Sequence, residues 1–307
     1  MPKRNKNILV MWNPTAGNGR KSQLFNSVIQ FLRNNGAQVV IYETIAAGGA
    51  TEYLSTYNGP ANVVVAAGGD GTVNEVINGL KDRNIDIALI PTGTTNVLAN
   101  ELALPGSAKA LGTIILHGIQ KSVYLGRLNG RRFSMMVGVG YDAWVVNKVN
   151  LSMKKRFGKL AYIISMVRQL SNLGGQVYDV QIDDERLSVG SMIVTNGRYY
   201  AGKFVLSRRA DLGHETVRAI VIVTQSRLKM FLALIALPFG MMEKMPFVRS
   251  IPAKRITVVT KRFDEHLDVL QADGDLAGSL PATIEVEDAP VTMLVAPRGN
   301  RKGKNSR

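Results

Sequence analysis

The sequence of 307 residues contains no cysteine and only three histidines, His117, His214 and His266. Without thiols the chain can form no disulfide, thiolate metal site or cysteine nucleophile, which fits a reducing compartment. The three histidines are not clustered, so no histidine-based metal site is indicated. Aromatic residues make up only 7% of the chain, and neither a base-stacking cluster nor a nucleic-acid-binding motif is visible. We therefore expect no nucleic-acid partner.

Apolar runs long enough to cross a bilayer are also missing. The most apolar segment, residues 228–242, is shorter than the roughly 20 residues that a spanning helix needs, and Pro238 and Gly240 interrupt it. A buried helix is the simpler interpretation of this segment, and a membrane-insertion element is the alternative. The apolar residues 8–12 are too few for a signal peptide. We predict a cytoplasmic protein that associates peripherally with a membrane.

Acidic residues are scarce beside basic ones, with 23 Asp and Glu against 38 Lys and Arg, and the net charge is +15. A charge of this size points to a polyanionic partner, and we predict an anionic membrane surface. The segment 154–168 has the pattern of a basic amphipathic helix, which fits docking on anionic lipid but equally fits a helix with a solvated basic face. Its basic residues are Lys154, Lys155, Arg156, Lys159 and Arg168.

The first 120 residues alternate short apolar runs with amphipathic helical patterns. The runs predict strands at 7–12, 38–43, 62–67 and 85–91, and the patterns predict helices at 22–34, 50–57, 73–80 and 96–102. Continuous apolar strands between helices are typical of a parallel sheet that is covered on both faces.

The pattern changes near residue 122. Beyond it, β-branched segments such as 123–128 and 187–195 are separated by turn residues at hairpin spacing, which favours an antiparallel β-sandwich. Helical stretches at 142–171 and 226–243 interrupt these strands. We therefore predict an α/β domain with a parallel sheet at 1–122 and a β-sandwich domain at 123–307. Whether the last strand returns to the first domain is left open.

Three glycine-containing loops follow predicted strands of the first domain, at residues 13–20, 68–75 and 91–96. On a parallel sheet the ends of these strands share one edge, where open α/β sheets bind ligands. Glycine lets a ligand approach the backbone, and N–H groups at a turn that leads into a helix form an anion site. The loops therefore predict a nucleotide-phosphate site, although ordinary capped turns leave a similar pattern. The candidate contact residues are Asn13, Pro14, Thr15, Gly17, Arg20, Gly68, Gly69, Gly71, Thr72, Glu75, Gly93, Thr94 and Asn96.

Asp70 stands among the glycines of the second loop, where a carboxylate would repel a phosphate. Its presence is explained if it holds Mg²⁺ against the phosphates or orders the loop through backbone N–H groups. The loops match neither the phosphate loop that ends in Lys-Ser/Thr nor the Gly-x-Gly-x-x-Gly dinucleotide fingerprint.

The order and spacing of the three loops resemble the ATP site of the diacylglycerol kinase catalytic family, which includes bacterial lipid kinases and sphingosine kinases. The resemblance extends to Thr195-Asn196-Gly197 and to a late Asp273-Gly274-Asp275 element, and it covers nearly the whole chain. It implies a nucleotide domain like those of phosphofructokinase and NAD kinase, followed by a β-sandwich. ATP, Mg²⁺ and a membrane lipid would meet between the two. The matching loop motifs are Asn13-Pro14-x-x-Gly17, Gly68-Gly69-Asp70-Gly71-Thr72-x-Asn74-Glu75 and Pro91-x-Gly93-Thr94-x-Asn96-x-x-Ala99.

By the same resemblance, Asp273 and Asp275 reach this site from the second domain. We expect Asp273 to take the proton of the lipid hydroxyl during phosphoryl transfer, with Asp70 and Asp275 organising Mg²⁺. The acceptor would be a hydroxyl of a lipid such as diacylglycerol or a sphingoid base. The number of subunits stays open, a homodimer included.

The sequence departs from the family pattern at several positions. Asn18 replaces the basic residue that often follows the first-loop glycine, so Arg20 or Lys21 is expected to contact the phosphates. Asp275 stands where the family has Glu, and residues 211–215 differ from the turn that binds a structural Mg²⁺ in some bacterial members. The alternatives are a kinase of a soluble acceptor, similar to NAD kinase, and a non-catalytic sensor of nucleotide or lipid.

Overall fold

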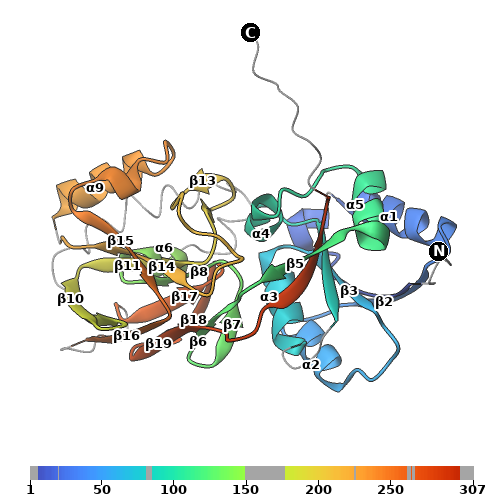
Figure 1. Cartoon of the computed structure of the whole chain (residues 1–307), viewed down its shortest axis with the longest axis horizontal. Coiled ribbons are helices and arrows are strands. Elements are labelled where there is room, and N and C mark those ends of the chain that lie inside the picture. The colour runs from blue at the N-terminus through green and yellow to red at the C-terminus, as the bar shows by residue number, and fades with distance from the viewer. Residues whose placement is uncertain are drawn as a thin grey trace, which may run out of the picture.

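The computed structural model describes residues 6–19, 21–80, 85–148, 177–224, 226–260, 264 and 267–297. These residues form two halves that lie next to each other along the long axis of the molecule (Figure 1). Within these ranges, no helix combines the length and apolar character needed to cross a membrane. Arg20 and the basic segment 154–168 lie outside the described residues, so their predicted roles stay predictions.

A six-stranded sheet forms the centre of the first half, with the strand order β2-β1-β3-β4-β20-β5. Its neighbouring strands run parallel except that β5 pairs antiparallel with β20. β3 is buried along its whole length, as expected of a central parallel strand with a continuous apolar sequence. The strands are β1 (Asn7–Trp12), β2 (Gln38–Glu43), β3 (Val63–Gly68), β4 (Asp86–Pro91), β5 (Ile119–Val123) and β20 (Val291–Val295).

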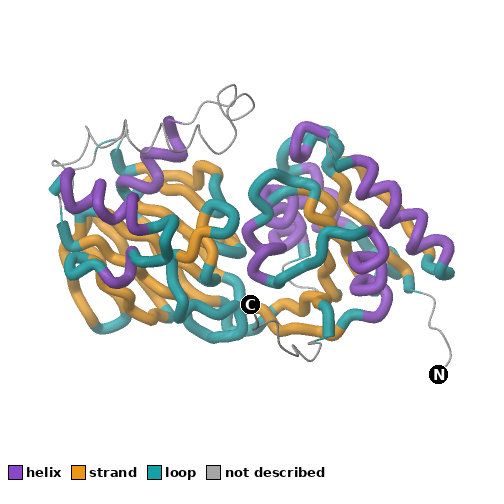
Figure 2. The backbone as a smooth tube through the Cα atoms, turned by 90° about the horizontal axis from the view of Figure 1, so that it is seen from above, coloured by secondary structure: helices purple, strands orange, loops and turns teal. Residues whose placement is uncertain are grey.

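Helices cover both faces of this sheet (Figure 2). Alternate side chains of β1 point to opposite faces. Leu9 and Met11 pack in one core cluster with α2 and α3, whereas Ile8 and Val10 pack in another with α1 and α5. The helices are α1 (Ser22–Asn34), α2 (Gly49–Thr56), α3 (Asp70–Gly79), α4 (Val97–Glu101) and α5 (Ala108–His117), and the 3-10 turn η1 (Ala16–Gly19) precedes α1.

Two six-stranded antiparallel sheets form the second half, with the orders β10-β9-β16-β19-β6-β7 and β15-β14-β11-β8-β17-β18. Their facing side chains share one core cluster, in which Phe133 and Tyr178 of the first sheet meet Val137 and Leu270 of the second. The first sheet contains β6 (Gly126–Leu128), β7 (Arg131–Phe133), β9 (Tyr178–Ile182), β10 (Glu185–Val189), β16 (Arg255–Thr260) and β19 (Ala282–Val286). The second contains β8 (Met136–Val139), β11 (Ser191–Thr195), β14 (Val217–Ile222), β15 (Val248–Ala253), β17 (Val269–Ala272) and β18 (Asp275–Ser279).

Smaller elements surround this sandwich. They are the hairpin of β12 (Tyr199–Tyr200) and β13 (Phe204–Val205), the helices α6 (Tyr141–Lys148) and α9 (Arg227–Ala236), and the 3-10 turn η3 (Met242–Lys244). α6 is the start of the helix predicted at 142–171, and the segment 149–176 lies outside the described residues.

The structure confirms the predicted fold class, an α/β half with a parallel sheet and an antiparallel β-sandwich. The predicted strands 123–128 and 187–195 are wrong in detail because the chain changes sheets inside each of them, and so is the strand predicted at 132–138, which is divided between β7 and β8. β5 ends at Val123 and β6 begins at Gly126, while β10 ends at Val189 and β11 begins at Ser191. The pattern analysis missed α5, although Ser107 before it is a helix cap that accepts a hydrogen bond from the backbone of Ala110 at 3.3 Å.

The chain passes between the halves twice, from β5 to β6 and from β19 to β20. The second passage brings β20 into the first sheet between β4 and β5, and Figure 1 shows β5 and β20 together on the side that faces the sandwich. The domain boundary at residue 122 stays a prediction.

Candidate active site

The three glycine loops meet at the ends of β1, β3 and β4. A Cβ atom on Gly17, whose φ is +62°, would lie 2.3 Å from the backbone oxygen of Thr92. One on Gly93 would lie 2.4 Å from the Cα of Gly69. Both distances are far below a van der Waals contact, so only glycine permits the loops to touch. We call this surface the loop rim, formed by residues 13–19, 68–72 and 91–96.

The first loop is held in shape by its own asparagine. Asn13 Oδ1 accepts hydrogen bonds from the backbone N–H and the hydroxyl of Thr15, at 3.0 and 2.8 Å. The backbone N–H of Asn13 donates to the Ala67 oxygen at 2.9 Å, which ties the loop to the end of β3. Asn13 therefore shapes the turn, Pro14 is partly buried, and Thr15 stands exposed at the surface of the rim.

Lys21 occupies the position between the first and third loops. Its ammonium group donates to the backbone oxygens of Pro91 at 3.0 Å and Gly93 at 3.3 Å. Lys21 thereby holds the third loop in place and brings a positive charge to the rim. Thr94, on the same loop, is exposed.

Asp70 links the second loop to the third. Its carboxylate accepts hydrogen bonds from the hydroxyl of Thr95 at 2.8 Å and from the backbone N–H of Val97 at 2.7 Å. Burial raises the pKa of the Asp70 carboxyl above its ordinary value; the Thr95 hydrogen bond opposes this, and the charge of Asp273 raises it further. Asp70 and Asp273 therefore act on one another electrostatically, although they belong to different halves.

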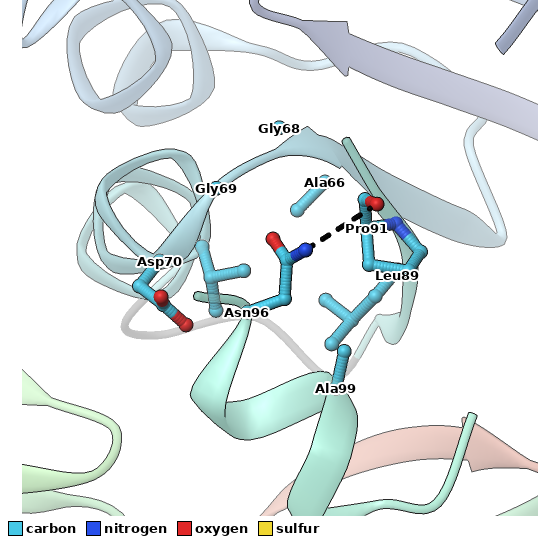
Figure 3. A pocket seen from close by; sticks show the side chains of 9 residues that line it. Ala66, Gly68, Gly69, Asp70, Leu89, Pro91, Asn96 and Ala99 are labelled. Carbon is cyan, nitrogen blue, oxygen red and sulfur yellow. Dashed lines mark hydrogen bonds between the residues drawn. The ribbon is translucent and has the colours of Figure 1, made fainter. Parts of the chain in front are cut away.

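Asn96 turns the third loop into α4 with a left-handed backbone, at a φ of 47°. Its side-chain amide donates to the Gly93 oxygen at 2.7 Å and points toward Pro91 (Figure 3). Among the described residues, Asn96 Oδ1 and Thr92 Oγ1 are buried acceptors for which no hydrogen-bond partner is found. The cavity beside Asn96 measures only about 10 Å³, room for a single water, so a nucleotide would lie on the rim and not inside it.

Glu75 contacts α2 of its own half, and Thr72 is buried within the second loop. The Glu75 carboxylate accepts hydrogen bonds from the backbone N–H groups of Gly48 at 2.9 Å and Ala50 at 3.0 Å, and so caps α2. The Thr72 hydroxyl lies 2.1 Å from where a Cβ on Gly68 would stand. The contacts of Glu75 favour a structural role, and its predicted contact with nucleotide stays a prediction.

Asp273 lies on the turn between β17 and β18, with a φ of 50°. One carboxylate oxygen accepts hydrogen bonds from the Ser134 backbone and hydroxyl at 2.7 and 3.0 Å and from the Asn74 amide at 3.0 Å. The other accepts from the backbone N–H groups of Met135 at 2.8 Å and Met136 at 3.1 Å. The carboxylate therefore accepts five hydrogen bonds, one from Asn74 on α3 and four from residues 134–136, and so joins the first half to the sandwich.

Asp275 stands two residues further on, at the start of β18, and is exposed. One of its carboxylate oxygens lies 3.6 Å from where a Cβ on Gly71 would stand, so it faces the second glycine loop across the junction. The turn that carries it is fixed by the Gly274 backbone N–H, which donates to Gln271 Oε1 at 2.9 Å. The structure therefore brings Asp70, Asp273 and Asp275 to one site.

Several buried residues that hold the two halves together were missed by sequence reasoning. Arg132 Nε donates to Glu287 at 2.6 Å, and its Nη1 donates to the backbone oxygen of Ile77 at 2.9 Å. Glu101, on α4, accepts from the backbone and side chain of Arg198 at 2.8 and 2.9 Å. Partners that lie 155 and 97 residues apart leave no spacing signal in a sequence.

A magnesium ion fits this site only together with phosphate. Among the described residues, no group of three or more His, Asp or Glu side chains is arranged to hold a metal ion. Mg²⁺ commonly binds through one or two carboxylates and the phosphates of a substrate, and Asp70 at the rim meets that requirement. In the stretch 211–215, the Gly213 N–H donates to Asp211 at 2.9 Å and the Tyr124 hydroxyl donates to Glu215 at 3.0 Å.

Comparison with known proteins identifies families that match both halves of the chain. Residues 7–128 match the family described as diacylglycerol kinase catalytic domain, and residues 135–295 match the family described as YegS C-terminal NAD kinase beta sandwich-like domain. The chain is 29% identical over 284 residues to a diacylglycerol kinase of Staphylococcus saprophyticus, covering 90% of this chain and 91% of that protein. It is 26% identical over 297 residues to a diacylglycerol kinase of Mycobacterium tuberculosis, covering 94% of each.

A solved structure shares the fold. The crystal structure of a diacylglycerol kinase from Bacillus anthracis matches with a TM-score of 0.79 at 23% identity, over 96% of this chain and 99% of that one. The two domain matches together span most of the described residues, and one of them alone covers more than half of the chain. The chain therefore belongs to the diacylglycerol kinase family and is a lipid kinase, which phosphorylates an alcohol group.

Proposed function

We propose that this kinase transfers the γ-phosphoryl group of ATP to a hydroxyl of a membrane lipid such as diacylglycerol, with Asp275 as the general base. The observation that carries the proposal is the position of the Asp275 carboxylate, which faces the glycine loop at Gly71 from the opposite half. The names of the relatives support diacylglycerol as the acceptor. We keep the predicted cytoplasmic and peripheral location as part of this proposal.

The loop rim suits the phosphates of ATP. α3 begins at Asp70, inside the second glycine loop, so the N–H groups of its first turn have no partner within the helix and attract an anion. Lys21 adds a positive charge beside the third loop.

The transfer itself requires alignment and one proton acceptor. The lipid hydroxyl oxygen forms the new bond to the γ-phosphorus, the bond from that phosphorus to the β–γ bridging oxygen breaks, and ADP leaves. The hydroxyl proton passes to the Asp275 carboxylate and then to water. Asp273 does not suit this step, because five donors already occupy its two oxygens and hold the turn on which Asp275 stands.

Asp70 is the residue that would hold Mg²⁺. The ion would neutralise phosphate charge and help to align the γ-phosphoryl group. The hydrogen bonds from Thr95 and Val97 fix the direction of the Asp70 carboxylate beside the rim.

The experiment is incubation of the purified protein with labelled ATP, Mg²⁺ and one acceptor at a time. Diacylglycerol, a sphingoid base and NAD separate the lipid kinase from the alternative that resembles NAD kinase. Label in diacylglycerol or the sphingoid base supports the proposal. Label only in NAD, or nucleotide binding without any transfer, refutes it.

The role of Asp275 is tested by paired substitutions. Asp275→Asn removes the base and is expected to lower kcat by a factor of about 10²–10⁴ with little change in the affinity for ATP. Asp275→Glu restores a carboxylate one methylene longer and should recover part of the activity. Equal kcat for Asp275→Asn and the unchanged protein would remove Asp275 from the role of base.

A further inference from the structure

The outward side of α9 and of the turn after it is apolar, although it faces solvent. Among the described residues, twelve large apolar side chains are exposed, and six of them fall between Leu228 and Met241. Phe239 is 71% exposed and Leu228 is 66% exposed. A soluble protein rarely gathers its exposed apolar side chains in one place unless the place has a partner. We call this surface the α9 patch, formed by Leu228, Phe231, Leu232, Ile235, Phe239 and Met241.

The patch is a second apolar face on a helix that already has one. Met230, Ala233 and Leu237 point inward and share a core cluster with side chains of β14 and β15. Leu228, Leu232 and Ile235 recur at helical spacing on the other side and remain exposed. The interpretation of 228–242 as a buried helix is therefore correct for one side only. A helix with apolar side chains on two sides needs an apolar environment for each of them. The sandwich provides that environment for one side of α9, and the other side is exposed.

Basic side chains border the α9 patch. Arg227, Lys229 and Lys244 are exposed on α9 and η3. The neighbouring acid, Glu243, accepts from the Ser207 hydroxyl at 2.6 Å, so it is engaged within the protein. An apolar helix face bordered by basic residues is typical of an element that lies in the interface of an anionic membrane.

The α9 patch lies on the same edge of the molecule as the active site. A Cβ on Gly240, in the turn after α9, would lie 3.2 Å from Cβ of Val205 in β13. The hairpin of β12 and β13 in turn contacts α4, where the Asn100 amide donates to the Gly202 oxygen at 3.2 Å. α4 begins at the third loop of the rim, and Figure 1 shows α9, β13 and α4 along one edge. A membrane beneath the patch would bring lipid to this edge.

We propose that the α9 patch inserts into the interfacial region of an anionic membrane and docks the kinase beside its lipid substrate. The inference rests on the proposed function, because a lipid acceptor is what makes docking useful. A second copy of the chain would also cover the patch, but two identical patches would bring their basic borders together, and like charges repel. An anionic membrane offers acyl chains to the apolar centre of the patch and negatively charged headgroups to its basic border.

The test is sedimentation of the full chain, without ATP, with vesicles of phosphatidylglycerol and phosphatidylcholine. Leu228→Gln combined with Phe239→Gln is expected to weaken binding by about tenfold for each substitution, from the lost transfer of apolar surface. The matched control is Ile45→Gln, because Ile45 is 97% exposed on the first half, away from α9. The control should bind as the unchanged protein does, and all proteins should bind less to phosphatidylcholine alone.

Three results would overturn the proposal. Undiminished vesicle binding by the double variant would show that the patch does not insert. A melting temperature several degrees lower would show that protein already covers the patch. A dimer of the unchanged protein that dissociates on substitution, with no effect on vesicle binding, would identify a second copy as the occupant.

Activity measurements separate this inference from the proposed function. With a short-chain diacylglycerol dissolved in water, the double variant is expected to keep the kcat/KM of the unchanged protein. With the acceptor embedded in vesicles, its rate should fall with its loss of binding. An unchanged protein that binds vesicles but phosphorylates no lipid would refute the proposed function and leave the docking result standing.

Discussion

The substitution Asp273→Asn is expected to lower the free energy of unfolding by about 2–4 kcal/mol. The Asp273 carboxylate accepts five hydrogen bonds, three of them from the consecutive backbone N–H groups of residues 134–136. An asparagine keeps one acceptor oxygen and replaces the other by an amide group that would meet donors. Each buried donor left without a partner costs about 1–3 kcal/mol, and partial access of water reduces the total.

The matched variant is Asp275→Asn, two residues away in the same turn. Asp275 is exposed, so its substitution is expected to change the free energy of unfolding by less than about 0.5 kcal/mol. Both variants would be unfolded in urea and monitored by circular dichroism, and their ATP affinity and kcat would be measured below the transition. Asp273→Asn should lose stability, and Asp275→Asn should lose kcat.

The reverse pattern would refute this reasoning. If Asp273→Asn is as stable as the unchanged protein and its kcat falls by orders of magnitude, then Asp273 is the base, as the sequence resemblance suggested. If Asp275→Asn keeps its kcat, Asp275 is not the base, and the proposed assignment fails whatever the result for Asp273→Asn.

Three further predictions test other contacts. Glu75→Gln should destabilise the protein by about 1 kcal/mol through the weakened cap of α2, while the dissociation constant for ATP stays unchanged in a titration. Gly17→Ala places a Cβ 2.3 Å from a backbone oxygen at a φ of +62°, so it should weaken ATP binding and lower the melting temperature. Burial raises the pKa of Asp142 despite hydrogen bonds from Tyr200 and Gln271, so the native protein holds this proton more tightly than the unfolded chain does. The stability of the unchanged protein relative to Asp142→Asn should therefore fall as the pH rises from about 4 through that raised pKa, which urea unfolding at several pH values would show.

The strand ends and loops of the first half were accessible to sequence reasoning because their signals are local. A continuous apolar run such as residues 63–68, followed by glycines and a helical pattern, predicts a parallel strand, a turn and a helix without reference to distant residues. Parallel strands share their carboxyl edge, so the same reasoning placed Gly17, Asp70 and Gly93 near each other.

The same reasoning could not distinguish the roles of Asp273 and Asp275. Asp273 and Asp275 are both acidic, both flank Gly274, and differ little in sequence context. The hydrogen-bond partners of Asp273 are Asn74 and residues 134–136, which lie more than a hundred residues earlier in the chain, and Asp275 faces the equally distant Gly71. No local pattern shows that Asp273 accepts hydrogen bonds from distant backbone groups, or that Asp275 faces the glycine loop.

The sequence alone therefore determined the fold class, the order of the glycine loops and the family resemblance, because apolar periodicity and turn residues act over a few neighbouring positions. Only the tertiary structure decided the different surroundings of Asp273 and Asp275, the cap that Glu75 forms on α2, and the exposure of one side of α9. Each of these depends on which distant segments come into contact, and contacts across the chain leave no trace in local spacing.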